Sequence, residues 1–159
     1  MTTPKPAPHM RASPSGLGHF EGKVHILPLR VYFEDTDLSG LVYHANYLRF
    51  MERGRTEFFR LAGISPADLD AAEPTAWALR SAALSFVRPA RLDDQLNLHS
   101  VVNAMSGARL NIVQRIYAKG DLLVEGRIEA CLLTLTGKPR RIPQPVRDLI
   151  APFLDEEAV

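Results

Sequence analysis

Apolar and polar residues alternate loosely along residues 24–33, "VHILPLRVYF", a stretch rich in strand-forming residue types. The period then changes. From Tyr47 to Leu61 the apolar residues recur at helical spacing, and charged residues cover the opposite side. Gly63 follows the last apolar residue, where a helix is expected to end. The pattern therefore predicts a strand over residues 24–33 and a helix over residues 45–61.

One residue conflicts with this helix. Gly54 lies in its middle, where glycine costs about 1 kcal/mol relative to alanine. We therefore expect the helix to pack closely on a neighbouring backbone at this position.

Four further segments have the character of strands: residues 77–87, 95–105, 108–118 and 122–135. The connections between the last three are short, "SG" and "KGD", which predicts antiparallel neighbours. Gly126 and Ala130 fall on one face of the last segment and leave room for a bulky helix. The stretch "PQPVRDLIAPFLDEE" begins with prolines and predicts a short terminal helix.

The order of these elements predicts an α+β fold, with an antiparallel five-stranded sheet whose apolar face is covered by the long helix. The other face of this sheet is not polar throughout. The apolar residues that alternate onto it are Val113, Tyr117, Leu123 and Leu133. Such a face predicts a partner surface, most simply that of a homodimer.

Length and composition narrow the classes of protein. A chain of 159 residues fits one domain with a real core. Its 19 Lys and Arg against 18 Asp and Glu give no support to nucleic-acid binding, which requires a basic excess. The single cysteine, Cys131, excludes an intrachain disulfide and suits a reducing cytosol. No apolar run approaches the roughly 20 residues that span a bilayer, so we expect a cytoplasmic protein.

The first twenty residues, "MTTPKPAPHMRASPSGLGHF", differ in composition from the rest. Their prolines, serines and glycines leave too little apolar surface to offset the entropy of ordering. A secretory signal would require a continuous apolar stretch, and this segment has none. The sequence predicts a disordered tail over residues 1–20 and a folded domain over residues 21–154. An organelle-targeting leader is the alternative, because the tail lacks acidic residues.

Residues 33–47, "FEDTDLSGLVYHANY", contain three acidic residues, a histidine and two tyrosines, more polar and ionisable side chains than a connecting turn requires. Backbone N–H groups at the start of a helix, here near His44, have no partners within the helix and carry partial positive charge. Asp37 lies seven positions earlier, and Gly40 permits a sharp turn between them. A carboxylate beside such donors suits acyl-transfer hydrolysis. The carboxylate activates water or attacks directly, and the donors stabilise the oxyanion.

Three other interpretations of this segment compete. Asp35, Asp37 and Ser39 imitate the first ligands of a calcium loop, but position 12 is Asn46 instead of a glutamate and a strand precedes the loop. The acids could also belong to a solvated loop that caps the helix, and spacing alone does not exclude this. A metal site from Asp35, Asp37 and His44 lacks a second pair of ligands at helical spacing.

A family resemblance changes this balance. The stretch "YFEDTDLSGLVYHANYLRFMERGRTEFFR" resembles the signature of the 4-hydroxybenzoyl-CoA thioesterase family of hotdog proteins. It is most similar to the branch called tol-pal system-associated acyl-CoA thioesterase. The stretches "FVRPARLDDQL" and "TGKPRRIP" also match, so the resemblance covers about residues 24–145. It implies the hotdog fold, in which the sheet wraps around one long helix, and hydrolysis of acyl-CoA to a free acid and CoA.

The resemblance also assigns roles to residues. It implies that Asp37 is the catalytic carboxylate and that the main-chain N–H of His44 is the oxyanion donor. The imidazole of His44 would orient the thioester or water, and Tyr43 and Asn46 would shape the pocket. The site would lie at the interface of a homodimer or homotetramer, and the reaction would need neither a metal nor an organic cofactor.

Arg88, Arg140 and Arg141 are candidates for contact with the phosphates of CoA, because guanidinium groups bind phosphate in two-pronged geometry. They could equally be solvated charges. An acyl carrier protein could replace CoA as the carrier. The rival functions are a non-catalytic acyl-CoA-binding regulatory domain and a hotdog hydratase or dehydratase. Asp37 beside the helix start argues against the first, and the motifs of the second are missing from the sequence.

Overall fold

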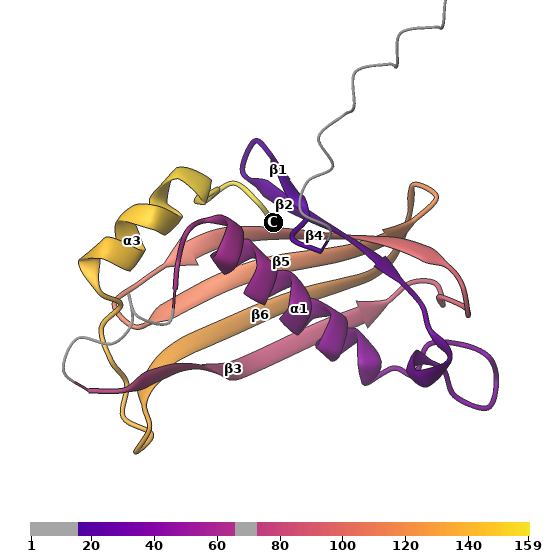
Figure 1. Cartoon of the computed structure of the whole chain (residues 1–159), viewed down its shortest axis with the longest axis horizontal. Coiled ribbons are helices and arrows are strands. Elements are labelled where there is room, and N and C mark those ends of the chain that lie inside the picture. The colour runs from indigo at the N-terminus through magenta and orange to yellow at the C-terminus, as the bar shows by residue number, and fades with distance from the viewer. Residues whose placement is uncertain (1–15, 66–72) are drawn as a thin grey trace, which may run out of the picture.

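The computed structural model describes residues 16–65 and 73–159 (Figure 1). Six antiparallel strands form one sheet in the order β1-β2-β4-β5-β6-β3. The strands are β1 (His19–Glu21), β2 (Val24–Arg30), β3 (Thr75–Phe86), β4 (Gln95–Met105), β5 (Arg109–Ala118) and β6 (Asp121–Thr134). The helices are α1 (Asn46–Leu61), α3 (Gln144–Ile150) and the 3-10 turns η1 (Phe33–Asp35) and η2 (Ala151–Phe153). The predicted α+β arrangement, a sheet wrapped around one long helix, is confirmed.

The prediction of five strands is wrong by one. The additional strand is β1, which pairs with β2 and contains His19 and Phe20, both of which the sequence assigned to the tail. The ring of Phe20 stacks on that of Phe153 and meets that of Phe58 edge-on, with centroids 4.0 Å and 5.1 Å apart. These long-range contacts hold the segment on the domain. The predicted disorder of residues 1–15 lies outside the described residues.

Most element boundaries agree with the pattern of the sequence. β4 has the predicted bounds, and α3 forms within the predicted terminal helix. β2 ends earlier than predicted, at Arg30, because the chain then turns into η1. Lys119 and Gly120, which join β5 to β6, both have positive φ, as the tight hairpin turn requires.

Among the described residues, none of the helices combines the length and the apolar character that a membrane-spanning helix needs.

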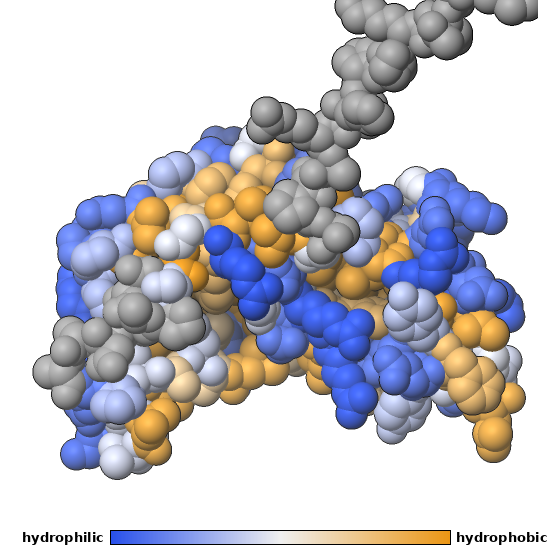
Figure 2. All heavy atoms as spheres, in the orientation of Figure 1, coloured by the Kyte–Doolittle hydropathy of each residue, from blue (hydrophilic) through white to orange (hydrophobic). Residues whose placement is uncertain are grey.

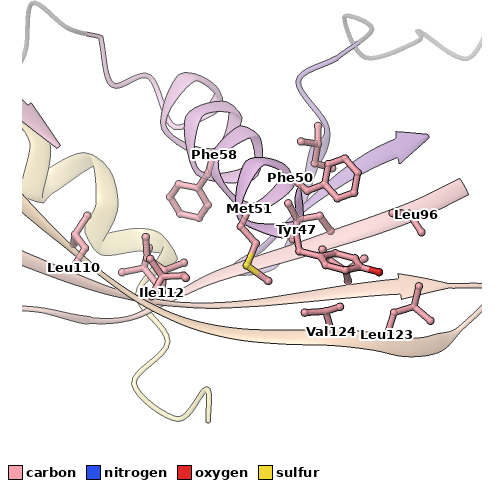
Figure 3. Packing of buried hydrophobic residues seen from close by; sticks show 14 of the residues in the cluster. Tyr47, Phe50, Met51, Phe58, Leu96, Leu110, Ile112, Leu123 and Val124 are labelled. Carbon is pink, nitrogen blue, oxygen red and sulfur yellow. The ribbon is translucent and has the colours of Figure 1, made fainter. Parts of the chain in front are cut away.

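The helix α1 lies across the concave face of the sheet and supplies much of the core. Tyr47, Phe50, Met51 and Phe58 point from α1 toward residues of the sheet (Figure 3). Gly54 makes this close approach possible, since a Cβ there would lie 2.4 Å from the side chain of Leu98. The predicted close packing at this glycine is confirmed, although the neighbours are side chains of the sheet and not its backbone.

The small residues of β6 act in the same way. A Cβ on Gly126 would lie 2.7 Å from the terminal methyl group of Met51. Gly126 therefore makes room for α1, as the sequence predicts. The charged side of α1 appears in Figure 2 as a hydrophilic stripe bordered by hydrophobic surface.

The prediction of an apolar outer face is wrong for Leu123, and a second residue of that face, Val113, is already buried. Leu123 is 5% exposed and belongs to the core under α1, because the register of β5 and β6 shifts between Ile116 and Tyr117. Val113 lies outside the core cluster under α1, pairs with Val101 of β4 and is only 2% exposed within one chain. Only Tyr117 and Leu133 remain partly open to a partner. The outer face is therefore a poorer interface than the sequence suggests.

Candidate active site

Asp35 holds the loop that precedes α1 against the start of that helix. Its carboxylate is buried and accepts hydrogen bonds from the main-chain N–H of Tyr32 and the side-chain amide of Asn46, both at 2.8 Å. Its main-chain carbonyl accepts from the N–H of Tyr43 at 2.9 Å. Asp35 thus has a structural role, and its oxygens are committed to the fold.

Asp37 has the opposite environment. Its side chain is exposed, and one carboxylate oxygen accepts from the hydroxyl of Ser39 and from the N–H of Ser39, the latter at 2.8 Å. These bonds lower the pKa of the Asp37 carboxyl below its ordinary value, and the nearby His44 adds to this effect. Asp37 is therefore an ionised carboxylate whose second oxygen is free of partners among the described residues.

The turn after Asp37 returns the chain toward the helix. The N–H of Asp37 donates to the carbonyl of Leu41 at 2.9 Å, and the N–H of Gly40 donates to the carbonyl of Asp37 at 3.0 Å. Gly40 has φ +77°, a backbone conformation that favours glycine. The predicted sharp turn at Gly40 is confirmed.

The start of α1 offers an unpaired donor. The N–H of Asn46 donates to the carbonyl of Tyr43 at 2.8 Å, and α1 has no side-chain cap. In the described part of the chain, the N–H of His44 has no acceptor. A main-chain donor at the positive end of a helix is therefore available to an oxygen of a ligand.

Asp37 and His44 line one pocket. Its volume is about 280 Å³, and its walls come from the start of α1 and from the end of β3. The lining residues are Asp37, Leu41, Val42, His44, Tyr47, Phe86, Val87, Arg88 and Pro89. A residue with a carboxylate and a residue at the helix start thus line one mostly apolar pocket, an arrangement that suits acyl-transfer hydrolysis.

Tyr47 ties the two sides of this pocket together. Its hydroxyl accepts a hydrogen bond from the N–H of Ala90 at 3.1 Å, so α1 is joined to the segment that follows β3. Burial raises the pKa of the Tyr47 hydroxyl, which remains neutral at ordinary pH. The sequence treated Tyr47 only as a core residue, and its helical spacing gave no sign of this role.

The other predicted residues are distributed differently. Arg88 lines the pocket, but its guanidinium pairs with Asp121 at 3.0 Å. Tyr43 is exposed next to the ring of His44, with centroids 4.5 Å apart, and does not line the pocket. Asn46 is buried against Asp35, so it positions the loop instead of shaping the wall.

Arg140 and Arg141 lie at the other end of the sheet. The N–H of Arg140 donates to the carbonyl of Leu132, and its side chain pairs with Glu73 at 3.3 Å, near the beginning of β3. The pocket lies at the end of β3, so a single chain does not bring these arginines to it.

Ser39 is a site residue that sequence reasoning missed. The signal was present, because an aspartate commonly accepts hydrogen bonds from the residue two positions later.

Comparison with known proteins identifies the family of the chain. The profile of the thioesterase-like superfamily matches residues 31–150. The chain belongs to this superfamily. A protein of Escherichia coli O6:H1 named acyl-CoA thioester hydrolase YbgC is 41% identical over 121 residues, which cover 75% of this chain and 90% of that protein. The acyl-CoA thioesterase YbgC of Haemophilus influenzae is 35% identical, covering 76% of this chain and 89% of its own length.

A solved structure is also similar. The chain superimposes on a probable thioesterase from Bartonella henselae with a TM-score of 0.72 and 39% identity, covering 76% of this chain and 99% of that one. The predictions of a hotdog fold and of a thioesterase are therefore confirmed. Within residues 16–65 and 73–159, no three His, Cys, Asp or Glu side chains cluster closely enough to hold a metal ion.

Proposed function

We propose that this thioesterase hydrolyses acyl-CoA to a free carboxylic acid and CoA, with Asp37 as general base or nucleophile. One observation carries the proposal: the ionised Asp37 and His44, whose main-chain N–H is unpaired among the described residues, line the same apolar pocket. The relatives from E. coli and H. influenzae, named acyl-CoA thioester hydrolase and acyl-CoA thioesterase, support acyl-CoA as the substrate.

The proposed reaction follows from the two groups. Ser39 holds one oxygen of Asp37, and the other oxygen removes a proton from water or attacks the thioester carbon itself. As the new C–O bond forms, negative charge develops on the carbonyl oxygen, which accepts a hydrogen bond from the N–H of His44. The C–S bond then breaks, and CoA leaves as a thiolate. In the general-base route this step yields the free acid, and the proton held by Asp37 passes to the thiolate. In the nucleophilic route it yields a mixed anhydride on Asp37, which water then hydrolyses to the free acid and the Asp37 carboxylate. The imidazole of His44, which is exposed at the pocket, would help to orient water.

We further propose that the active protein is a homodimer, or a tetramer built from such dimers, with the site at the subunit interface. β3 supports this, because it is 12 residues long, forms one edge of the sheet and, within residues 16–65 and 73–159, pairs with β6 alone. Its apolar residues are unusually open, with Leu79 47% and Phe86 55% exposed. An open edge of this kind readily pairs with another strand.

The bulge in β3 makes the strand complementary to itself. The register of β3 against β6 shifts between Leu79 and Ser81, so the residues that face α1 are odd-numbered before the shift and even-numbered after it. Antiparallel pairing of two copies about a two-fold axis between residues 80 and 81 would therefore match inner residues with inner residues. Phe86 would lie opposite Thr75 of the second copy, and Leu84 opposite its Trp77.

This pairing also gives Arg140 and Arg141 a function. In one chain they lie near the beginning of β3, so in the proposed dimer they would approach the pocket of the second copy. There they would bind phosphates of CoA together with Arg88. Assignment to the tol-pal-associated branch, action in the cytoplasm and use of an acyl carrier protein as an alternative substrate remain proposals. The sequence motifs around Asp37 support the first of these, and the single cysteine, Cys131, suits the second.

The test is a panel of acyl-CoA thioesters, aliphatic and aromatic, assayed for release of free thiol. We expect turnover of at least one acyl class by the wild-type protein and its loss in Asp37→Asn. A non-catalytic acyl-CoA-binding domain would bind the same thioesters without releasing thiol, and that result would replace the proposed function with its rival.

A further inference from the structure

Arg55 is a half-buried arginine that has no carboxylate within ion-pair distance among the described residues. Its guanidinium donates to the side-chain oxygen of Gln114 at 2.9 Å. Burial lowers the pKa of Arg55, and the charge of Glu52 partly offsets this. A guanidinium has five N–H donors, so most of those on Arg55 remain available to a ligand.

A buried polar network fixes the position of Arg55. Gln114 is fully buried, and its amide nitrogen donates to the main-chain carbonyl of Met51 and to the hydroxyl of Ser100, both at 2.9 Å. The amide can therefore present only its oxygen to Arg55. The guanidinium is held in one place before any ligand arrives, which reduces the entropy cost of binding.

Arg55 lines a groove between α1 and the open edge strand β3. The groove has a volume of about 150 Å³. The residues that line it are Glu52, Arg55, Thr56, Phe59, Trp77, Ala78, Leu79 and Ala130. The rings of Phe59 and Trp77 stack at 5.5 Å, so the groove has an aromatic wall beside its two charged side chains.

The charges of the groove favour a neutral polar ligand. Glu52 and Arg55 lie three positions apart on one helix, and one oxygen of Glu52 accepts from the hydroxyl of Thr56 at 2.6 Å. A carboxylate ligand would be attracted by Arg55 and repelled by Glu52, and an ammonium group would meet the reverse. A hydroxyl accepts from Arg55 and donates to Glu52, so it satisfies both.

We propose that this groove binds a hydroxyl group at the far end of the substrate's acyl group, and that Arg55 is thereby a specificity-determining residue. The inference rests on the proposed thioesterase function and on pairing through β3. That pairing places Trp77 and Leu79 of one copy on the same inner sheet face as Phe86 of the other. The groove of each copy then lies beside the pocket of its neighbour, about two residues or 7 Å along the strand.

The experiment compares CoA thioesters that differ by one hydroxyl: hexanoyl-CoA with 6-hydroxyhexanoyl-CoA, octanoyl-CoA with 8-hydroxyoctanoyl-CoA, and phenylacetyl-CoA with 4-hydroxyphenylacetyl-CoA. We expect kcat/KM of the wild-type protein to be about 10-fold higher for the hydroxylated member of at least one pair, the scale of one hydrogen bond to a charged group. Arg55→Met should abolish that preference and leave the plain thioester within about 3-fold of wild type. Arg53→Met, which removes an exposed arginine of the same helix, should keep the preference.

Glu52→Gln provides a second test at an exposed position, in case Arg55→Met does not fold. Removal of this negative charge should raise kcat/KM for adipoyl-CoA, whose far end is a carboxylate, by several-fold. Equal kcat/KM within every pair for the wild-type protein would overturn the inference. So would an equal loss on both members in Arg55→Met, which indicates a structural role, or an unchanged adipoyl-CoA rate in Glu52→Gln. Failure of the proposed function differs from these outcomes, because no thiol would then be released from either member.

Discussion

The side-chain amide of Asn46 donates to the carboxylate of Asp35 at 2.8 Å, across eleven residues of sequence. Asn46 is the first residue of α1, and Asp35 precedes the turn that carries Asp37. This buried bond fixes the distance between the helix start, with its unpaired N–H at His44, and the exposed carboxylate. In the proposed mechanism Asp35 therefore has the structural role and Asp37 the chemical one.

We predict that Asp37→Asn lowers kcat by at least about 100-fold, the usual scale for loss of a general base. The carboxylate is exposed, so the midpoint of urea unfolding should remain close to that of the wild type. Thiol release measured under saturating acyl-CoA checks the rate. Equal activity of Asp37→Asn and wild type would refute the assignment.

Asp35 should behave in the opposite way. Asp35→Ala leaves the buried amide of Asn46 and the partly buried N–H of Tyr32 without their acceptor, so the free energy of unfolding should fall by about 1–3 kcal/mol for the buried donor and by less for the other. Asp35→Asn keeps one acceptor oxygen, and its loss of activity should be milder than that of Asp37→Asn. Urea titration followed by circular dichroism measures the first effect. A fully stable Asp35→Ala would contradict the structural role.

His44 separates a main-chain effect from a side-chain effect. His44→Ala keeps the N–H that the helix start supplies, so its rate should fall less than that of Asp37→Asn. His44→Pro removes the N–H and should be slower than His44→Ala. Both variants must first be shown to fold by circular dichroism. Equal rates for the two would mean that the oxyanion donor lies elsewhere.

The pH profile should report the hydrogen bonds from Ser39. The pKa of Asp37 lies below its ordinary value of 3.8, and catalysis requires the ionised form, so kcat/KM should fall only when the pH drops through that lowered pKa. Ser39→Ala removes the hydroxyl donor, which contributes most to the lowering, and leaves the donor of the main chain. The acid limb of kcat/KM should therefore move to higher pH. An acid limb at the same pH in both proteins would show that Asp37 is not the titrating group.

Assembly through β3 is tested by light scattering. We expect the wild-type protein to be a dimer or a dimer of dimers at micromolar concentration. Ala82→Glu places a charge on the exposed inner side of the strand, opposite Leu79 of the second copy, and should yield monomers with reduced thiol release. Tyr117→Ser, on the outer face, is the matched control and should leave the dimer intact. A wild-type protein that is only monomeric would contradict the shared site.

Local patterns predicted the parts of the fold that depend on local periodicity. The alternation in residues 95–105 and the helical spacing after Tyr47 gave β4 and α1 nearly to the residue. The three-residue strand β1 escaped prediction because it depends on Phe20 meeting Phe58 and Phe153, which are distant in sequence. The sequence also did not predict the bulge near Leu123. One extra residue in a strand moves the following side chains to the other face of the sheet, and no residue pattern here indicates where that extra residue lies.

The sequence predicted the part of the candidate site whose residues lie close together along the chain. Asp37, Gly40 and His44 fall within one segment, and elementary properties of a helix start bring them together. Asp35 and Asp37 could not be told apart, because burial distinguishes them and burial depends on tertiary contacts. The distance of Arg140 from the pocket within one chain was hidden for the same reason.

Gly54 gives the site a dependence on a position far from it. The missing side chain lets α1 rest directly on Leu98, Ser100 and Gln114, so this glycine sets the height and tilt of the whole helix above the sheet. The N–H of His44 lies at the N-terminal end of this helix, whereas Phe86 and Val87, on the other wall of the pocket, lie at the end of β3. Packing at the middle of the helix therefore determines the width of the pocket proposed to bind the thioester. A larger side chain at Gly54 would shift the N–H of His44 relative to the carbonyl oxygen of the substrate.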